Sequence, residues 1–130
     1  MFAKPLRDSL PRLLLGLRLR CPNCGQGKTF TSLFKMEETC SVCHVRYERQ
    51  SGESVGGMYI NLGAAELLSI GGYFVTLILF HPPVALNAGF WILFNIIFVL
   101  LFYRHSRSLW IATVYLNGGV KTDEEYKREN

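Results

Sequence analysis

A stretch of the chain that is almost free of charge constrains its fold more than any other feature. Residues 58–103 contain no lysine or arginine and a single acid, Glu66. Two apolar runs, 58–80 and 85–103, occupy this stretch, and the sequence HPPV separates them. At about 1.5 Å per helical residue, each run can cross a hydrocarbon core roughly 30 Å thick. The sequence therefore predicts a membrane α-helical hairpin made of two transmembrane helices.

The basic residues indicate how this hairpin is oriented. All 14 Lys and Arg precede the first run or follow the second, and the turn at 81–84 has none. Because basic flanking segments are retained in the cytoplasm, we expect both termini there. The N-terminal segment lacks a small-residue cleavage site, so we expect no cleavable signal peptide. We therefore predict a protein of the bacterial cytoplasmic (inner) membrane, with the segment before the first helix on the cytoplasmic side.

Four cysteines in that segment form two C-x2-C pairs, Cys21 with Cys24 and Cys40 with Cys43. Their spacing, C-x2-C-x15-C-x2-C, lies at the short end of the zinc-ribbon range. Four thiolates can bind a tetrahedral Zn²⁺ ion at about 2.3 Å. The segment has few large apolar side chains, namely Phe30, Phe34 and Tyr47, so the metal is expected to hold it together. The sequence predicts a small zinc-ribbon β module over residues 21–50.

The second cysteine pair also matches another signature. CSVCH at 40–44 is the attachment pattern of c-type haem, with His44 as the axial ligand. That reading leaves the first cysteine pair without a role and requires export of a segment that the charges keep inside. A module of this size also cannot bury a porphyrin. We therefore expect no haem and interpret His44 as a surface residue, while an iron site on the same four cysteines stays open.

The remaining segments flank the module and the hairpin. Residues 1–20 are a basic amphipathic lead-in in which Pro5 and Pro11 limit where a helix starts, and 51–57 are a Gly/Ser hinge. In 104–130, SLWIATVYL is either an interfacial helix or a continuation of the second span, and a charged tail, expected to be solvated or frayed, follows. We predict lipid-head contacts, and no nucleic acid, for the following residues of these segments: Arg12, Arg18, Arg20, Arg104, Arg107 and Trp110.

Several polar residues lie within the predicted transmembrane helices. A carboxyl group in a membrane is costly, so Glu66 suggests a proton relay, a metal or quinone contact, or an ion pair with a partner. A hydrogen bond within a helix interface is the simpler explanation. Two stripes of small or polar residues are expected to contact partner helices: Asn61, Ala65, Ser69 and Gly72 in the first helix, and Asn87, Trp91 and Asn95 in the second.

The pattern RCPNCGQGKTF at 20–30, followed by a second C-x2-C pair, a GE hinge and two apolar runs, resembles the bacterial family called domain of unknown function 983. The resemblance spans 15–115 and is most specific over 20–27. It implies a zinc ribbon on a two-span anchor. His44 departs from the family pattern, which more often has glycine there. Genes of this family often lie near those of haem-copper oxidases, which implies a respiratory or other energy-converting complex as the partner.

These observations lead to one expected function and two alternatives. We expect a non-catalytic, zinc-binding integral membrane protein, not an enzyme, that serves as an accessory subunit or assembly factor of a larger membrane complex. Its expected partners are membrane lipids and other transmembrane subunits. The first alternative is electron or proton transfer, through iron in the four-cysteine site or through Glu66. The second is metal sensing or delivery, which requires an exchangeable ion.

Overall fold

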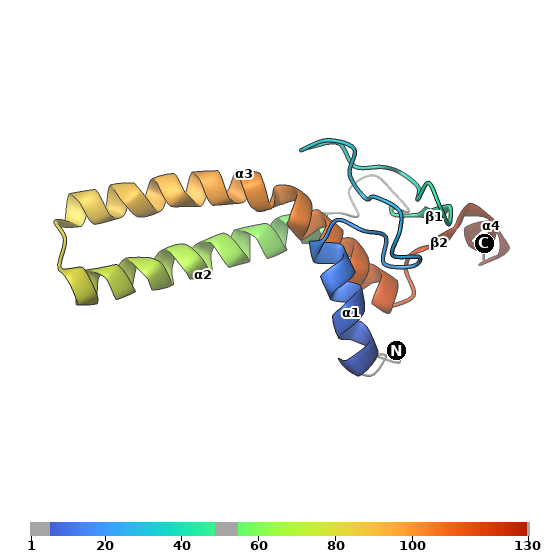
Figure 1. The fold of residues 1–130 in the computed structure, drawn as a ribbon, viewed down its shortest axis with the longest axis horizontal. Coiled ribbons are helices and arrows are strands. Elements are labelled where there is room, and N and C mark those ends of the chain that lie inside the picture. The colour runs from blue at the N-terminus through green and yellow to red at the C-terminus, as the bar shows by residue number, and fades with distance from the viewer. Residues whose placement is uncertain (1–5, 49–54, 130) are drawn as a thin grey trace.

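The computed structural model describes residues 6–48 and 55–129, so most of the hinge predicted at 51–57 lies outside the described residues. The elements follow in the order α1 (Leu6–Leu17), β1 (Val45–Arg46), α2 (Val55–Phe80), α3 (Val84–Leu116), β2 (Lys121–Thr122) and α4 (Asp123–Glu129). Figure 1 shows α2 and α3 side by side as a long hairpin, with all the other elements gathered at one end. That end contains the four-cysteine segment.

Helices α2 and α3 have 26 and 33 residues, and both are long and apolar enough to cross a membrane. The prediction of two long apolar helices is confirmed. The turn between them contains Pro82 and Pro83, which have no backbone N–H group to continue a helix. His81, just after α2, has a left-handed φ of 49°. This sharp turn sends α3 back along α2.

Small residues let the two helices approach closely at both ends of the hairpin. A Cβ atom on Gly72 would overlap the ring of Trp91, and one on Gly57 would lie 2.8 Å from the Cα of Arg107. Ala65, between these two points, is completely buried. Because a larger side chain at any of these positions would separate the helices, the small residues determine the spacing of the hairpin.

The polar residues of the two stripes make hydrogen bonds across the hairpin. Asn61 and Asn95 use their amide groups to donate to the carbonyl of Val99 and the hydroxyl of Ser69, each at 2.9 Å. Asn87 donates to the Tyr73 carbonyl at 3.2 Å. The Thr76 hydroxyl forms a further link between the helices. It accepts a hydrogen bond from the indole N–H of Trp91 and donates one to the side-chain oxygen of Asn87. These stripes therefore join α2 to α3, and they do not by themselves require a second protein.

Helix α3 runs without a break through the charged residues that follow the apolar run. Of the two alternatives for SLWIATVYL, the structure has the continuation of the second helix. Helix α1 crosses this extension, where a Cβ on Gly16 would lie 2.9 Å from that of Ala112. Pro11 lies inside α1 rather than at its start. In Figure 1, α1 runs across the direction of the hairpin.

The C-terminal tail is folded rather than frayed, although most residues of α4 are exposed. Gly118, with φ of 77°, ends α3 in a turn in which the N–H of Gly119 donates to the carbonyl of Val114. The chain then forms β2, which pairs antiparallel with β1, and α4 follows. Thr122 and Glu125 form a capping box at the start of α4, with the Glu125 carboxylate accepting from the Thr122 N–H at 2.7 Å. Local capping and the distant pairing partner together order this charged segment.

Candidate metal centre

The four cysteine sulfurs come together in one cluster, and all of them lie within 4.8 Å of one another. Across the two pairs, Cys21 Sγ lies 3.6 Å from Cys43 Sγ, and Cys24 Sγ lies 3.7 Å from Cys40 Sγ. Tetrahedral bonds of about 2.3 Å place ligand sulfurs about 3.8 Å apart, so the observed separations fit a tetrahedral ion. The four cysteines are therefore positioned to bind one metal ion, as the sequence predicted.

Each cysteine pair belongs to a tight turn that ends on a left-handed residue. The Gly25 N–H donates to the Cys21 carbonyl, and the His44 N–H donates to the Cys40 carbonyl, at 2.9 and 3.0 Å. The φ angles of Gly25 and His44 are 71° and 60°. Left-handed φ costs a non-glycine residue about 1 kcal/mol, so His44 strains the second turn. The exposed His44 is not part of the sulfur cluster.

Gly27 is a further requirement of the centre. Its carbonyl accepts from the Cys21 N–H at 2.8 Å, which fixes the backbone beside the first turn. A Cβ atom on Gly27 would overlap the sulfur of Cys40. Sequence reasoning gave Gly27 no separate role, although it is the second glycine of the CGQG stretch. Only a hydrogen atom fits between this backbone and the sulfur cluster.

The surroundings of the sulfurs raise the pKa of one cysteine thiol and lower the pKa of two others. Burial raises the pKa of the Cys21 thiol to about 12. Burial also acts to raise the pKa of Cys40, but hydrogen bonds from the backbone amides of Cys43 and Val42 outweigh it and lower that pKa to about 6. Backbone amides likewise outweigh burial and lower the pKa of Cys24. A cation at the centre would supply the positive charge that the buried Cys21 thiolate lacks.

Tyr47 is a neighbour of the sulfurs that sequence reasoning counted only as a large apolar side chain. It is 3% exposed, it belongs to the same buried core as Cys21 and Cys40, and its hydroxyl donates to the Lys28 carbonyl at 3.5 Å. Burial and these sulfurs raise its pKa far above the usual value, so Tyr47 remains a donor. Its protonated hydroxyl in turn acts to lower the pKa of the Cys21 and Cys40 thiols, which favours the thiolate form that binds metal. No spacing rule places Tyr47 here, because its position depends on β1.

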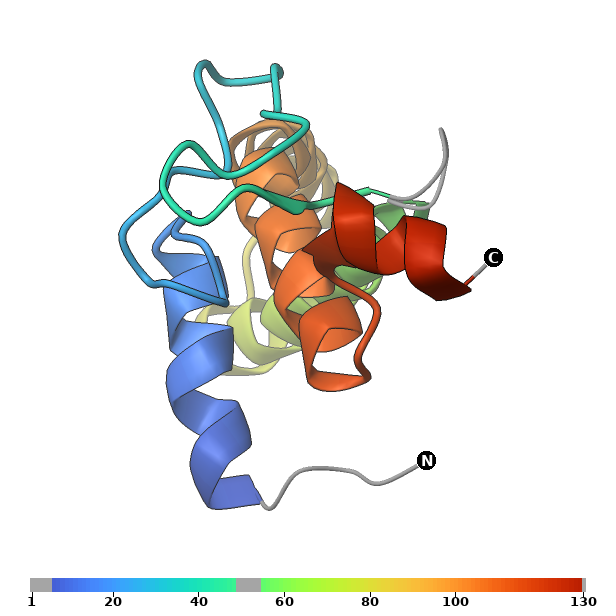
Figure 2. The same cartoon turned by 90° about the vertical axis from the view of Figure 1, so that its right-hand side faces the viewer.

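The cysteine segment packs directly on the C-terminal half of α3. Six buried residues form the joint core, and they come from the cysteine segment, α3 and the tail: Cys21, Cys40, Val45, Tyr47, Ile111 and Val120. Beside this core, Glu48 forms a 2.8 Å ion pair with Arg107 of α3. Figure 2, which views the hairpin from this end, shows α1, the cysteine segment and α4 arranged around α3. The metal centre is thus part of the base of the hairpin.

The six predicted lipid-head residues have varied surroundings. Arg12 donates to the carbonyls of Pro22 and Asn23, at 2.6 and 2.9 Å, and so joins α1 to the first cysteine turn. Arg20 donates to the Gln26 carbonyl, Arg107 pairs with Glu48, and Trp110 covers Gly56. Arg18 is exposed and Arg104 is half-buried. Contact with lipid heads stays a prediction for all six.

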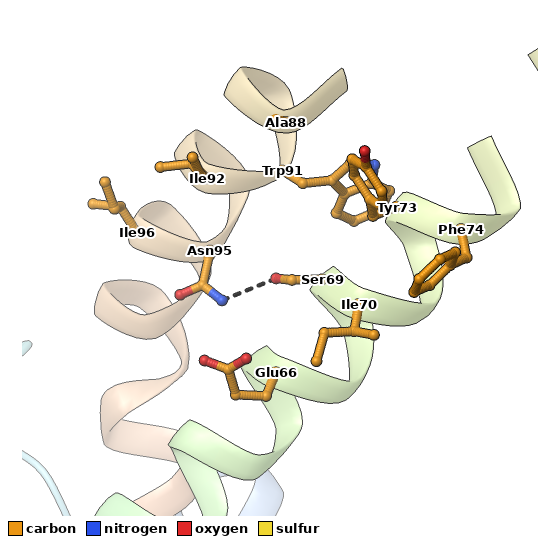
Figure 3. Close-up of a pocket in the computed structure, with 10 residues that line it drawn as sticks. All are labelled: Glu66, Ser69, Ile70, Tyr73, Phe74, Ala88, Trp91, Ile92, Asn95 and Ile96. Atoms are coloured by element: carbon orange, nitrogen blue, oxygen red, sulfur yellow. Dashed lines mark hydrogen bonds between the residues drawn. The ribbon is translucent and has the colours of Figure 1, made fainter. Parts of the chain in front are cut away.

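Glu66 lies in a groove between α2 and α3 with a volume of about 460 Å³. Figure 3 shows its carboxyl group near the hydrogen bond between Asn95 and Ser69, with Tyr73 and Trp91 further along the groove. Glu66 is exposed, and within residues 6–48 and 55–129 it makes no hydrogen bond or ion pair. The side chains of Asn61, Ser69, Asn87 and Asn95 each make a hydrogen bond inside the hairpin, although the Oδ1 atom of Asn61 is buried without a partner among the described residues, and Glu66 differs from them in being exposed.

The fold and the site define a small protein in which a four-cysteine metal centre is packed at the base of a two-helix apolar hairpin. The chain belongs to the DUF983 family, described as proteins of unknown function, whose family model matches residues 30–115. This match contains the second cysteine pair, all of α2 and all of α3 except its last residue, and it begins after the first pair. Neither the search of curated proteins nor that of solved structures found a match.

Proposed function

We propose that this chain is a non-catalytic integral membrane protein in which the four cysteines hold a structural zinc ion. The observation that carries the proposal is the sulfur cluster, whose 3.6 and 3.7 Å separations suit a tetrahedral ion. Four thiolates fill a tetrahedral coordination shell, which leaves no position for a substrate or a water nucleophile. When bound, the ion crosslinks the two cysteine turns. The zinc-ribbon spacing favours zinc, and iron on the same ligands is the alternative.

Two observations support insertion of the hairpin in the bacterial cytoplasmic membrane. Both long helices have the length and composition of spans, and the basic residues of α3 begin only at Arg104. Figure 1 places α1, the cysteine segment and α4 at the same end of the hairpin. Since basic flanks stay inside, that end faces the cytoplasm, where cysteines remain reduced and able to bind metal.

The proposed role is that of an accessory subunit or assembly factor of a larger membrane complex, respiratory or otherwise energy-converting. Glu66 supports this role, because a carboxyl group exposed to lipid is costly and gains from a donor on a partner helix. The closed metal shell supports it as well, because it suits a structural part rather than a reaction centre. The four-cysteine module would then stiffen the cytoplasmic base of the hairpin against its partner.

Metal quantification and native purification together test this function. We expect about one zinc ion per chain, no visible absorption band, and other transmembrane polypeptides that co-purify after gentle crosslinking. A coloured preparation that contains iron would favour electron transfer. A chain that purifies alone from its native membrane would contradict the accessory role. Replacing Glu66→Gln, which keeps the shape of the side chain, should reduce the co-purified partner while the zinc content stays constant.

The second candidate is proton transfer through Glu66, whose carboxyl group has no hydrogen-bond partner among the described residues and lies in a groove that also contains Tyr73, Ser69 and Asn95. This candidate predicts that Glu66→Gln abolishes the activity of the partner complex although the complex still assembles. Full activity of a complex that contains the Gln variant would exclude the relay.

A further inference from the structure

The loop of residues 31–35, TSLFK, projects from the cysteine segment. The bridge between Phe30 and Met36 closes its base. Leu33 and Phe34 at its tip are 52% and 59% exposed. Phe34, counted from the sequence among the few large apolar side chains of the module, therefore lies outside its core. Two adjacent bulky apolar side chains on the surface of a small polar module mark a contact surface.

The backbone at the base of this tip is paired within the loop. The N–H groups of Thr31 and Ser32 donate to the Lys35 carbonyl at 3.0 and 3.4 Å, and the Lys35 N–H donates to the Ser32 hydroxyl at 3.3 Å. Polar backbone groups must have partners before a segment enters an apolar medium. The N–H groups of Thr31, Ser32 and Lys35 meet this requirement within the loop, whereas Leu33 and Phe34 make no backbone hydrogen bond among the described residues. The tip therefore suits the boundary of the bilayer, where water remains as a partner for these two peptide groups, rather than the hydrocarbon core.

The position of the tip along α3 indicates what surrounds it. The ring of Phe34 lies 5.6 Å from that of Tyr103, the last residue before the first charge of α3, Arg104. Leu100 and Leu101, one turn earlier, are more than half exposed. In Figure 1 the loop extends along α3 towards the hairpin. Phe34 thus continues the apolar surface of the proposed span at the level where aromatic residues favour the membrane interface.

We propose that residues 31–35 form a membrane-inserting tip on the metal module. Leu33 and Phe34 enter the boundary between headgroups and acyl chains, and the exposed Lys35 lies at the level of the lipid phosphates. The partner of the tip is lipid, because the tip continues the apolar surface of α3, which itself faces lipid in the proposed span. The inference rests on the proposed membrane insertion of α2 and α3. The tip gives the metal module a direct contact with lipid, in addition to the attachment that its packing on α3 provides.

Photocrosslinking of the full chain in nanodiscs of phosphatidylcholine and phosphatidylglycerol tests the tip. Benzoylphenylalanine replaces one residue at a time: Leu33 at the tip, Val42 as the aqueous control or Leu67 as the lipid control. Val42 is 50% exposed in the second cysteine turn, a close match to Leu33, and Leu67 is 79% exposed on α2. Irradiation is followed by mass spectrometry of lipid adducts, and the metal content of each variant confirms its fold.

We expect adducts at positions 33 and 67, with about tenfold less at position 42, because water surrounds the second cysteine turn. Adducts at position 67 with equal, low yields at 33 and 42 would overturn the tip and leave the spans intact. A lack of adducts at position 67 would instead contradict membrane insertion, and the tip with it. Should the variant at position 33 lose its metal, Phe34→benzoylphenylalanine, which keeps an aromatic ring, supplies the same comparison.

Discussion

The hydroxyl groups of Thr29 and Ser108 lie 3.1 Å apart, and both residues are completely buried between the cysteine segment and α3. Thr29 follows the first cysteine turn and Ser108 lies in the extension of α3 beyond its apolar run. A buried hydroxyl pair contributes only while both partners are present. This contact therefore reports whether the metal module is docked on the hairpin.

Removal of one hydroxyl should loosen that docking. We expect Thr29→Val to lower the free energy of unfolding of the module by about 1–2 kcal/mol, because the Ser108 hydroxyl then stays buried without its partner. Metal release during thermal denaturation in detergent measures the loss. The double variant Thr29→Val, Ser108→Ala should lose less than the two single changes together. Strict additivity would show that the two groups do not interact.

Gly27 should be essential for metal binding, because a Cβ atom there would overlap the Cys40 sulfur. We expect Gly27→Ala to weaken metal affinity at least about tenfold, the scale seen when the surroundings of metal ligands are disturbed. Competition with a coloured chelator measures the affinity. Gly63→Ala is the matched control, because apart from the adjacent turns of its own helix no described residue lies within 4 Å of the added methyl group. Equal affinities of the two variants would contradict the proposed packing.

His44 should be replaceable by glycine with a gain in stability. Its φ of 60° suits glycine, so His44→Gly should stabilise the module by about 0.5–1 kcal/mol and keep the metal. His44→Ala, which keeps the strained φ, should give no such gain. Unfolding midpoints and metal content of the three proteins test this. Loss of metal in the glycine variant would make His44 a ligand, against the four-sulfur centre.

The capping box should make the start of α4 sensitive to acid. Hydrogen bonds from the N–H and hydroxyl of Thr122 lower the pKa of Glu125. A carboxyl group whose pKa is lowered by folding stabilises the folded form above its usual pKa, and this contribution disappears as the pH falls through the lowered value. The protection factors of the α4 amides, which correct for the slower intrinsic exchange at low pH, should therefore fall in acid.

Two variants separate the cap from general charge effects. Glu125→Gln should show faster exchange in α4 already at neutral pH. Glu124→Gln removes the same charge from the neighbouring position, which has no hydrogen bond or ion pair among the described residues, and should leave exchange unchanged. Similar exchange in both variants would mean that the cap does not hold the helix.

Local patterns in the sequence predicted the parts of this fold that depend on few distant contacts. The charge-free runs predicted both long helices, and the spacing of Cys21, Cys24, Cys40 and Cys43 predicted the sulfur cluster. The docking of the cysteine segment on Ile111 and Val120 depends on side chains far apart in sequence, and no periodicity shows such a contact. For the same reason the exposure of Phe34 and the contact of Tyr47 with the sulfurs escaped prediction.

The sequence of the C-terminal tail, in contrast, did contain local signals for its structure. Thr122 and Glu125 have the spacing of a capping box, and Gly118 suits the left-handed end of α3. High charge in the segment suggested a solvated or frayed tail, and the structure has an exposed but helical one. The pairing of β2 with β1, only two residues long in each strand, was too short to predict.

X-ray absorption spectroscopy at the metal edge, on full-length protein purified from its native membrane, tests the central claim most directly. The four-cysteine centre predicts about one zinc ion per chain, surrounded by four sulfur atoms at about 2.3 Å and no nitrogen or oxygen. A shell with a nitrogen or oxygen ligand, or a preparation with far less than one metal ion per chain, would contradict a closed structural site formed by Cys21, Cys24, Cys40 and Cys43.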